Sequence, residues 1–415
     1  MHYKIYYYTL LCLFLIGNTI CLASNCLEPI GWGARAVGRG GVEIAIADDT
    51  SALNSNPAGI TQIKGKQLDL GFGVFSPKIR LKNRYGHNHT SVQNYPAPEF
   101  GYVAHLKGKP ISLGVGIFGN SGLGVHHLYI NNPNFTLPVK GDSKLGVAKA
   151  NVAIAYEFYN KLSIGVALNF YYVQYSLSSS LGEAILDADK MHAPGYGACV
   201  GFLYKPSNKW AFGLSYTFKP HIDDLHTDDS HLVLPTGQVV DCRTRLRNFG
   251  VPRKLCLGIA YRPTNRWLIG ADVEWQQYSR IFNEFIVNLS NTGGPDMEMR
   301  LPFHFRDTYI FSIGTEYQAF KYLCLRCGYS FSKDVSPDGS HFAVSPLLDD
   351  FHNISVGIGT IWRKYELNAS FVYGPEGKGR NETSKFPKGN PAPEFSRSVT
   401  YYKDMHFNLC ITRHF

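Results

Sequence analysis

The side chains of this sequence that could do chemistry are isolated rather than grouped into a catalytic motif. No GxSxG segment places a serine on the sharp turn that many hydrolases use for their nucleophile. His126 and His127 are adjacent, but no cysteine or acidic residue lies close to them in sequence, so they make a poor metal site. We therefore expect no catalytic residue, no metal site and no cofactor.

The cysteines do not point to a chemical site either. Cys324 and Cys327 have CxxC spacing, but they fall in a segment that alternates like a strand, where residues three apart face opposite sides. Of the nine cysteines, Cys12 and Cys21 precede Ser24, and the remaining odd number argues against a complete set of disulfide bonds. We interpret the later cysteines as packing residues.

A segment of a different kind runs from Gly31 to Ile63 and is rich in Gly and Ala, without the alternation of a strand. Small residues let a segment pack closely inside another structure. The turn at Asn56–Gly59 follows from Pro57, which disfavours helix at the preceding residue. We predict a compact plug over residues 24–65, with these gate residues: Asp48, Asp49, Asn56, Pro57 and Ala58.

The first residues have the form of a secretory signal peptide. They contain Lys4, an apolar core from Leu10 to Ile16, and a small-residue exit that predicts cleavage near Ala23, so we assign residues 1–23 to the leader. Cys26 is one position too late for a lipid attachment site. No later run of 18 apolar residues predicts a transmembrane helix, which leaves a soluble exported protein or a β-barrel.

The composition favours the barrel. Aromatic residues make up 14% of the chain, with 26 Tyr and 26 Phe, and there are 41 Gly, as expected for a wall with aromatic girdles and tight turns. Only 18% of the residues are charged, which argues against a disordered chain. The net charge of +9 is scattered singly, so we expect contact with anionic lipid headgroups and not with nucleic acid.

Segments of ten or more residues with alternating polarity recur from Gln67 to the end. Strands of soluble sandwiches usually have about 5–6 residues, whereas a tilted strand needs about 9–11 residues to cross a membrane. Similar patterns occur at 267–275 and 323–331, with charges on the face that we assign to the lumen. The clearest apolar face is Leu162, Ile164, Val166, Leu168, Phe170 and Tyr172.

The connections between these segments alternate strictly between long and short. The long ones are Lys82–Ala97, Asn120–Ser143, Ser178–Ala193, Pro220–Thr236, Ser279–Phe305, Lys333–Phe351 and Pro375–Val399. The short ones are Lys107–Pro110, Tyr159–Lys161, Pro206–Asn208, Pro263–Asn265, Ala319–Lys321 and Arg363–Lys364. Thirteen connections predict an all-β, fourteen-stranded antiparallel transmembrane barrel over residues 66–415, with the plug in its lumen. Short periplasmic turns and longer external loops are typical of outer-membrane barrels.

Two segments need interpretation. Gly237–Arg262 is interrupted by Gly250–Pro252, and we interpret it as one strand with a bulge, because a turn there would break the alternation. The last segment, Tyr401–Phe415, has an apolar face and ends in an aromatic residue. That ending resembles the tag by which the barrel assembly machinery recognises outer-membrane barrels.

Several motifs occur together in this order. The most specific are in the plug: Ala34–Ala36, Gly40–Gly41, Ala47–Asp49 and Asn56–Gly59. Others are Pro252–Trp275, Phe305–Asp307, Gly328–Tyr329, Ser345–Pro346 and Ser355–Gly357. Through them the chain resembles the FadL-type outer-membrane transporters of long-chain fatty acids and other hydrophobic compounds, over essentially its whole mature length.

The resemblance implies a path for the cargo. An apolar groove between external loops captures it, an inner pocket gated by the plug receives it, and a gap beside a kink in the third strand releases it laterally into the membrane.

We expect the kink at Gly119, Asn120 and Gly122, with Asn56–Ala58 against it, because glycine reaches backbone angles that β-branched residues avoid. An ordinary strand end is the alternative. The following loop is unusually apolar, which favours capture at Leu128, Tyr129, Ile130, Phe135 and Leu137.

Arg306 matches a basic position of the family and could pair with a substrate carboxylate. A structural ion pair with Asp307 or a loop acid is the alternative, and Lys149 and Arg326 are further basic candidates.

The implied partners are a long-chain fatty acid or other hydrophobic small molecule, outer-membrane lipid, and the assembly machinery through Phe415. We expect a monomer without enzymatic activity in the outer membrane of a Gram-negative bacterium. Two other classes stay open, an outer-membrane lipid hydrolase and a general porin, although a plug would block a porin's open lumen.

Overall fold

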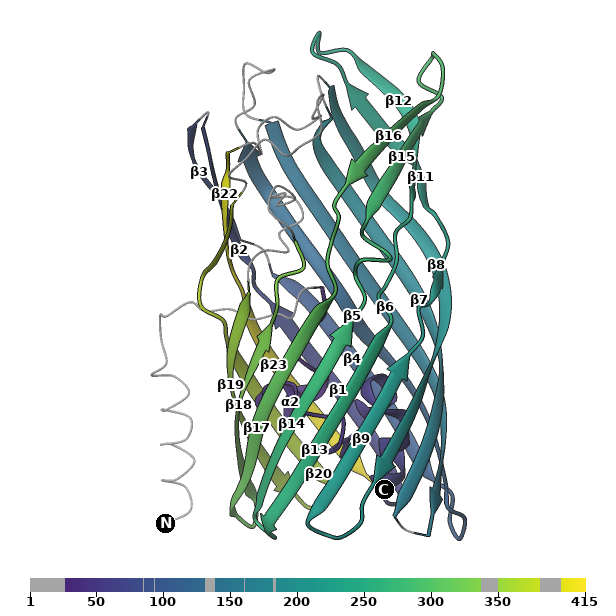
Figure 1. The fold of residues 1–415 in the computed structure, drawn as a ribbon, viewed down its shortest axis with the longest axis vertical. Helices are drawn as coiled ribbons and strands as arrows, with labels where there is room; N and C mark the ends of the chain where they lie inside the picture. Colours follow the sequence, from purple (N-terminus) through teal and green to yellow (C-terminus); the bar gives the residue numbers. More distant parts are fainter. Residues whose placement is uncertain are drawn as a thin grey trace.

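The computed structural model describes residues 27–84, 86–92, 94–130, 139–159, 161–181, 184–336, 350–380 and 397–415. Fourteen antiparallel strands close into a barrel (Figure 1), because the first, β1, pairs with the last, β23, from Gln67↔His414 to Phe75↔His406. The predicted strand number is therefore confirmed. Around the wall the strands are β1 (Lys66–Phe75), β4 (Tyr95–His105), β5 (Ile111–Ile130), β6 (Val139–Phe158), β7 (Leu162–Leu181), β8 (Ala184–Tyr204), β9 (Trp210–Thr217), β13 (Lys254–Thr264), β14 (Trp267–Gln276), β17 (Thr308–Phe320), β18 (Leu323–Ser332), β19 (Phe351–Trp362), β20 (Tyr365–Tyr373) and β23 (Met405–His414).

The alternation that predicted the wall separates its two faces. On β7, Leu168 and Phe170 are each 54% exposed and face outward, whereas Ala167 and Asn169 are buried in the lumen. Cys324 is buried and Cys327 is exposed, so the CxxC pair faces opposite sides as expected. No described helix combines the length and the apolar character that crossing a bilayer requires.

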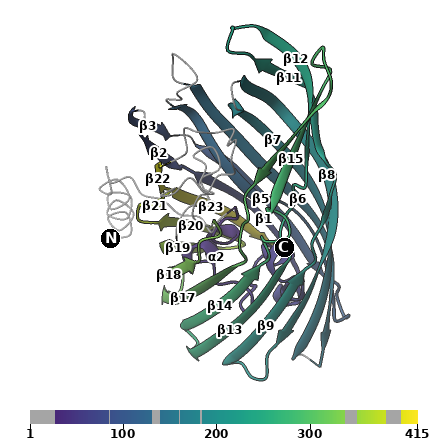
Figure 2. The ribbon, with the colours of Figure 1, turned by 45° about the horizontal axis from the view of Figure 1, so that its top comes forward.

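The external end of the barrel contains more strands than predicted. The strands β10 (His221–Ile222), β11 (Leu225–Val233), β12 (Val239–Arg247), β15 (Glu284–Ser290) and β16 (Met297–Pro302) extend the main sheet. A separate sheet, in the order β21-β22-β2-β3, lies on the other side of the external mouth (Figure 2). Its members are β2 (Lys78–Asn83), β3 (Gly86–Val92), β21 (Gly377–Arg380) and β22 (Val399–Lys403).

Three predictions about the external segments are wrong. Gly237–Arg262 is not one bulged strand, since β12 pairs with β11 and β15, whereas β13 pairs with β9 and β14. The break has a physical cause, because Asn248 has a φ of 67° and Pro252 has no N–H to donate. The loops predicted at Asn120–Ser143 and Ser178–Ala193 are mostly continuations of β5–β6 and β7–β8, whose ladders extend to Ile130↔Val139 and Leu181↔Ala184. The last barrel strand begins at Met405 rather than Tyr401.

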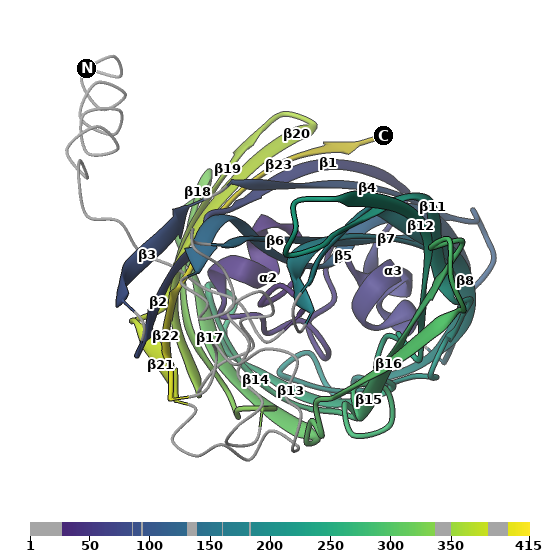
Figure 3. The same ribbon diagram turned by 90° about the horizontal axis from the view of Figure 1, so that it is seen from above.

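The plug fills the lower lumen with three short elements, α2 (Gly33–Gly38), α3 (Ala52–Ser55) and the 3₁₀-helix η1 (Pro57–Gln62) (Figure 3). Wall glycines allow its backbone to lie directly against the strands. A Cβ on Gly314 would stand 1.9 Å from the backbone oxygen of Arg39. The small residues of plug and wall therefore give a close contact between the two.

Candidate functional site

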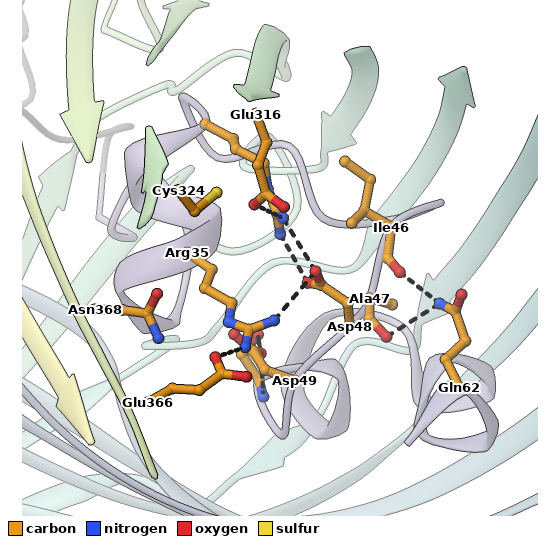
Figure 4. A network of polar contacts seen from close by, with 12 residues as sticks. Arg35, Ile46, Ala47, Asp48, Asp49, Gln62, Glu316, Cys324, Glu366 and Asn368 are labelled. Atoms are coloured by element: carbon orange, nitrogen blue, oxygen red, sulfur yellow. Dashed lines mark hydrogen bonds and ion pairs between the residues drawn. The ribbon is translucent and has the colours of Figure 1, made fainter. Parts of the chain in front are cut away.

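Charged side chains join the plug to the wall in the middle of the barrel (Figure 4). Arg39 is almost fully buried, and its guanidinium lies 3.0 Å from Asp48 of the plug and 3.1 Å from Glu316 of β17. Arg35 pairs with Asp48 at 3.4 Å and with Glu366 of β20. Because a buried charge needs a partner, this network fixes the plug against two separate regions of the wall.

The two adjacent aspartates of the plug are in opposite electrostatic states. Burial alone would raise the pKa of Asp48, but the charges of Arg39 and Arg35 hold it well below its usual range. Burial, together with the charges of Asp69 and Asp48, raises the pKa of Asp49 to about 6. Asp48 therefore holds the plug as a carboxylate anion. The carboxyl group of Asp49 favours docking when it is protonated.

The wall also binds the backbone of the plug. Three carboxylates, from β4, β1 and β14, accept hydrogen bonds from backbone N–H groups. The pairs are Gly33 N to Glu99 Oε2 (2.9 Å), Thr50 N to Asp69 Oδ2 (2.9 Å), and Glu43 N and Ile44 N to Asp272 Oδ2 (2.7 and 2.9 Å). These bonds fix the path of the plug without using its side chains.

Asn56 fixes the turn that the sequence predicted. Its Oδ1 accepts from Ala58 N at 3.2 Å, and its Nδ2 donates to Ile44 O of the plug at 2.8 Å and to Phe202 O of β8 at 3.1 Å. A Cβ on Gly165 of β7 would stand 2.4 Å from Ala58 N. Asn56–Ala58 therefore lies against β7 and β8, and the prediction that it lies against the third strand is wrong.

The third barrel strand, β5, is irregular at Asn120. Its pairing with β4 ends at Glu99↔Phe118, although β5 itself continues. Its pairing with β6 continues too, but the register shifts between Gly119 and Ser121, which marks a β-bulge. The bulge coincides with the predicted bend and lies within a strand, so the alternative of a simple strand end is wrong.

Glycine backbone angles do not hold this bend, contrary to the prediction. Gly119 and Gly122 are not among the glycines with positive φ. Gly119 instead gives room, since a Cβ there would stand 3.2 Å from the Cβ of Ala97 on β4. A Cβ on Gly122 would meet nothing closer than Leu145 O at 3.6 Å.

The beginning of the plug binds the bulge. Gly122 N donates to Leu27 O at 3.0 Å, and Asn120 Nδ2 donates to Glu28 Oε1 at 3.4 Å. Asn54 of α3 lies at the same place, with its Nδ2 3.5 Å from Asn120 Oδ1. The plug thus contacts the bulged strand through Leu27, Glu28 and Asn54.

A large apolar cluster fills the barrel between the plug and the external strands. We call this cluster of packed side chains the chamber. It is formed by buried side chains of β6, β7, β8, β11 and β12 and of the segment 278–305, which includes β15. Five phenylalanines pack there with neighbouring ring centroids 4.9–6.3 Å apart: Phe249, Phe282, Phe285, Phe303 and Phe305.

Lys149 lies on β6 between the chamber and the plug. The side chain of Val147, two residues away, belongs to the chamber, and Ala153 belongs to the cluster that packs against the plug. Lys149 is 1% exposed, and among the described residues no acidic side chain forms an ion pair with it. Glu28, which is close by, is bound by Lys254 at 2.8 Å, and the Lys149 amine lies 5.8 Å from the ring centre of Tyr171.

The comparisons with known proteins agree with this architecture. The family model described as "Outer membrane protein transport protein (OMPP1/FadL/TodX)" matches residues 28–380. The chain belongs to this family. No curated protein sequence gives a significant match.

Solved structures of the OMPP1/FadL/TodX fold superpose over nearly the whole chain. The toluene transporter TodX of Pseudomonas putida is 21% identical, with a TM-score of 0.79 over 93% of this chain and 99% of that one. The toluene transporter TbuX of Ralstonia pickettii is 19% identical, with a TM-score of 0.76 over 93% and 98%. A FadL homologue of Pseudomonas aeruginosa is 14% identical, with a TM-score of 0.76 over 94% and 100%.

The predicted ligand residues of this family member are spread over the external half. Arg306 precedes β17, is exposed, and forms no ion pair with Asp307, whose carboxylate accepts from Ser279 Oγ at 2.6 Å. Arg326 is bound to Glu316 at 2.6 Å, which makes it part of the plug network. Leu128, Tyr129 and Ile130 end β5, whereas Phe135 and Leu137 lie outside the described residues.

Sequence reasoning missed the chamber and the two ions at its floor, Glu28 and Lys254. Their signal is weak, because the chamber residues come from many separate parts of the chain between Leu27 and Val335. The described residues contain no group of three or more His, Cys, Asp or Glu side chains placed to bind a metal ion.

Proposed function

We propose that this outer-membrane transport protein takes up long-chain fatty acids or similar hydrophobic acids. The observation that carries the proposal is the chamber with Lys149 at its floor. An acyl chain gains about 0.8 kcal/mol for each CH₂ transferred from water into such an environment. A buried ammonium without a carboxylate partner is costly, and the acid group of the cargo would supply that partner.

Capture takes place at the external mouth in this proposal. The apolar residues that follow the bulge and Arg306 are assigned to it. Support comes from Tyr129, which is 46% exposed, and from Phe303 and Phe305, which belong to the chamber and come shortly before the exposed Arg306 in sequence. An acid held first by Arg306 would then have its chain beside the aromatic side chains of the chamber.

Release is lateral in this proposal, through the wall where β5 leaves β4. The loss of β4–β5 pairing beyond Glu99↔Phe118 supports this route, because the wall there is not held by a ladder of backbone hydrogen bonds between β4 and β5. Leu27 and Glu28 bind the bulge, Leu27 also belongs to the chamber, and Glu28 binds Lys254, so this segment connects the apolar cluster with the place where β5 leaves β4.

The test compares two ligands on three proteins. The Lys149→Met variant keeps the length of the side chain and removes the charge, and the Lys144→Met variant makes the same change at an exposed position on the same strand. We expect Lys149→Met to weaken binding of a long-chain acid by about 1.5–3 kcal/mol, which is the range of a hydrogen bond to a charged group. Binding of an alkane of equal length should hardly change, and Lys144→Met should bind both ligands like the wild type.

Equal losses for the acid and the alkane would refute the role given to Lys149. Single-channel recording separates the transporter from a general porin, since the plugged barrel should show little steady conductance. Release of fatty acid from added phospholipid by the purified protein would instead identify a lipid hydrolase.

A further inference from the structure

The short turns at one end of the barrel are uniformly basic. They cover residues 106–110, 159–161, 205–209, 265–266, 321–322 and 363–364, and each contains at least one Lys or Arg and no Asp or Glu. In outer-membrane barrels the short turns face the periplasm. This rim therefore has an excess of positive charge that no acid of the same turns neutralises.

One place on this rim is hollow. A cavity of about 390 Å³ lies between the plug and the wall, lined by Lys161, Lys205, Lys209 and Arg262 from the wall and by Ala45, Ile46 and Gln62 from the plug. None of these four cations forms an ion pair with an acid of the described part of the chain. Glu157, whose charge acts on Lys205, is itself paired with Lys64 at 3.1 Å.

The cavity lies at the depth of the lipid headgroups. Trp210 contributes to its lining and is 40% exposed, and its ring lies 4.3 Å from that of Tyr261 on the neighbouring strand. Tyr204, just before Lys205, also faces outward. Outward-facing Trp and Tyr side chains mark the membrane–water interface, so the four cations lie beside the headgroup layer.

We propose that this cavity binds the phosphate headgroup of an anionic phospholipid from the periplasmic leaflet. Guanidinium and ammonium groups are the side chains that bind phosphate best, and a cavity of this size holds a headgroup rather than a single water molecule. The acyl chains would extend along the apolar outer face of the barrel, from Trp210 toward the centre of the bilayer. The site is independent of the cargo and of the route by which the cargo leaves.

The lipid would also hold the plug. Lys205 Nζ donates to Gln62 Oε1 at 3.3 Å, and Gln62 Nε2 donates to Ala47 O at 3.1 Å (Figure 4 shows the second contact). Gln62 thus joins the cationic wall of the cavity to the segment just before Asp48. A headgroup that fixes Lys205 should therefore reduce opening of residues 45–62.

The experiment titrates the full-length purified protein in detergent with phosphatidylglycerol and measures the one-to-one adduct by native mass spectrometry. Phosphatidylcholine is the zwitterionic reference. A Lys205→Gln, Arg262→Gln variant removes two cavity charges, and a Lys321→Gln, Lys364→Gln variant removes two rim charges elsewhere. We expect an affinity loss of about 30-fold for the first variant and less than about threefold for the second.

Two further measurements complete the test. Lys205→Arg should keep the binding, and phosphatidylglycerol should slow amide exchange in residues 45–62 of the wild type. Heat-modifiable gel migration confirms that each variant is folded. Equal losses for both double variants would overturn the proposal, because they would show diffuse attraction to the whole rim. Soluble glycerol phosphate that binds as tightly as the lipid would overturn it too.

Discussion

Asp48 and Asp49 are neighbours in the plug, yet replacing each by asparagine should have opposite effects. Asp48 is held by Arg39 at 3.0 Å and by Arg35 at 3.4 Å; the Arg39 side chain is buried and the Arg35 side chain is 13% exposed. Removing one partner of a buried ion pair costs about 3–5 kcal/mol when the other charge is left alone, and the cost here should lie at or below the lower end because Arg39 keeps Glu316 and Arg35 keeps Glu366. Asp48→Asn should therefore weaken docking of the plug by a few kcal/mol.

Asp49→Asn should leave docking unchanged or strengthen it. The pKa of Asp49 rises from 3.8 to about 6 in the docked plug, so its charged form costs docking about 3 kcal/mol at pH 7.5. Asparagine removes that cost, and its Oδ1 can still accept the hydrogen bond that Ser51 N donates at 2.9 Å. The two substitutions conserve size equally, so each serves as the control for the other.

The pH dependence follows from the same two groups. The docked plug holds a proton on Asp49 that the free plug releases at lower pH, so the contribution of Asp49 to docking should weaken as the pH rises from about 4 to about 6. The pKa of Asp48 is lowered, so its contribution is present above pH 3.8 and is lost only in stronger acid.

Hydrogen exchange of residues 33–63, followed by mass spectrometry between pH 4 and pH 8 and corrected for intrinsic rates, measures the free energy of opening. Asp49→Asn should reduce the pH dependence without removing it, because burial also raises the pKa of Glu43 in the plug. If Asp49→Asn opened the plug as much as Asp48→Asn does, Asp49 would be a charged anchor and the electrostatic reasoning would fail.

Three other predictions concern the plug and the bulge. Deleting residues 31–63 should leave a barrel that folds, seen as heat-modifiable migration, but that conducts ions steadily in a planar bilayer; loss of the folded form would assign the segment to the wall. Gly165→Val should displace η1, because its Cβ would stand 2.4 Å from Ala58 N, and should speed exchange of residues 57–62 without unfolding the barrel. Gly119→Val should reduce uptake while ligand binding persists, because its Cβ would stand 3.2 Å from the Cβ of Ala97 on β4 and crowd the place where β5 leaves β4. Gly122→Val has room for its first carbon and is the matched control; wild-type uptake by Gly119→Val would contradict a lateral route at the bulge.

The sequence predicted the wall because lipid imposes a simple rule on it. Where one face of a strand meets lipid, as at Leu168 and Phe170, the apolar alternation is visible in the residues alone. Beyond the membrane that rule ends. Arg243, Arg245 and Arg247 alternate with buried residues on β12. This alternation alone predicts a wall strand, which is why the prediction of one bulged strand over Gly237–Arg262 is wrong. The register of β12 is set by its pairing with β11 and β15, and no pattern within the residues of β12 predicts these partners.

The site was less predictable because its contacts join residues far apart in the chain. The plug motif was visible at Asn56–Gly59, but its position against β7 and β8 depends on the register of the closed barrel. Arg39 and Glu316 are 277 residues apart, and no motif around either residue indicates that the two are in contact. The sequence shows Lys149 only as a basic residue within a strand. Its burial, and the lack of an ion pair with a described acidic residue, depend on how the plug and the wall pack around it.

The carboxylates that bind the backbone of the plug also determine the order in which the protein is assembled. Helices of six and four residues, such as α2 and α3, are too short to form alone in water, so the plug has little structure before it docks. Its docking groups, Glu99, Asp69 and Asp272, come from β4, β1 and β14, which reach their final positions only when the wall is complete. We therefore expect the plug to take its final form only after the wall has closed, so that the ordering of the plug is the last step of folding.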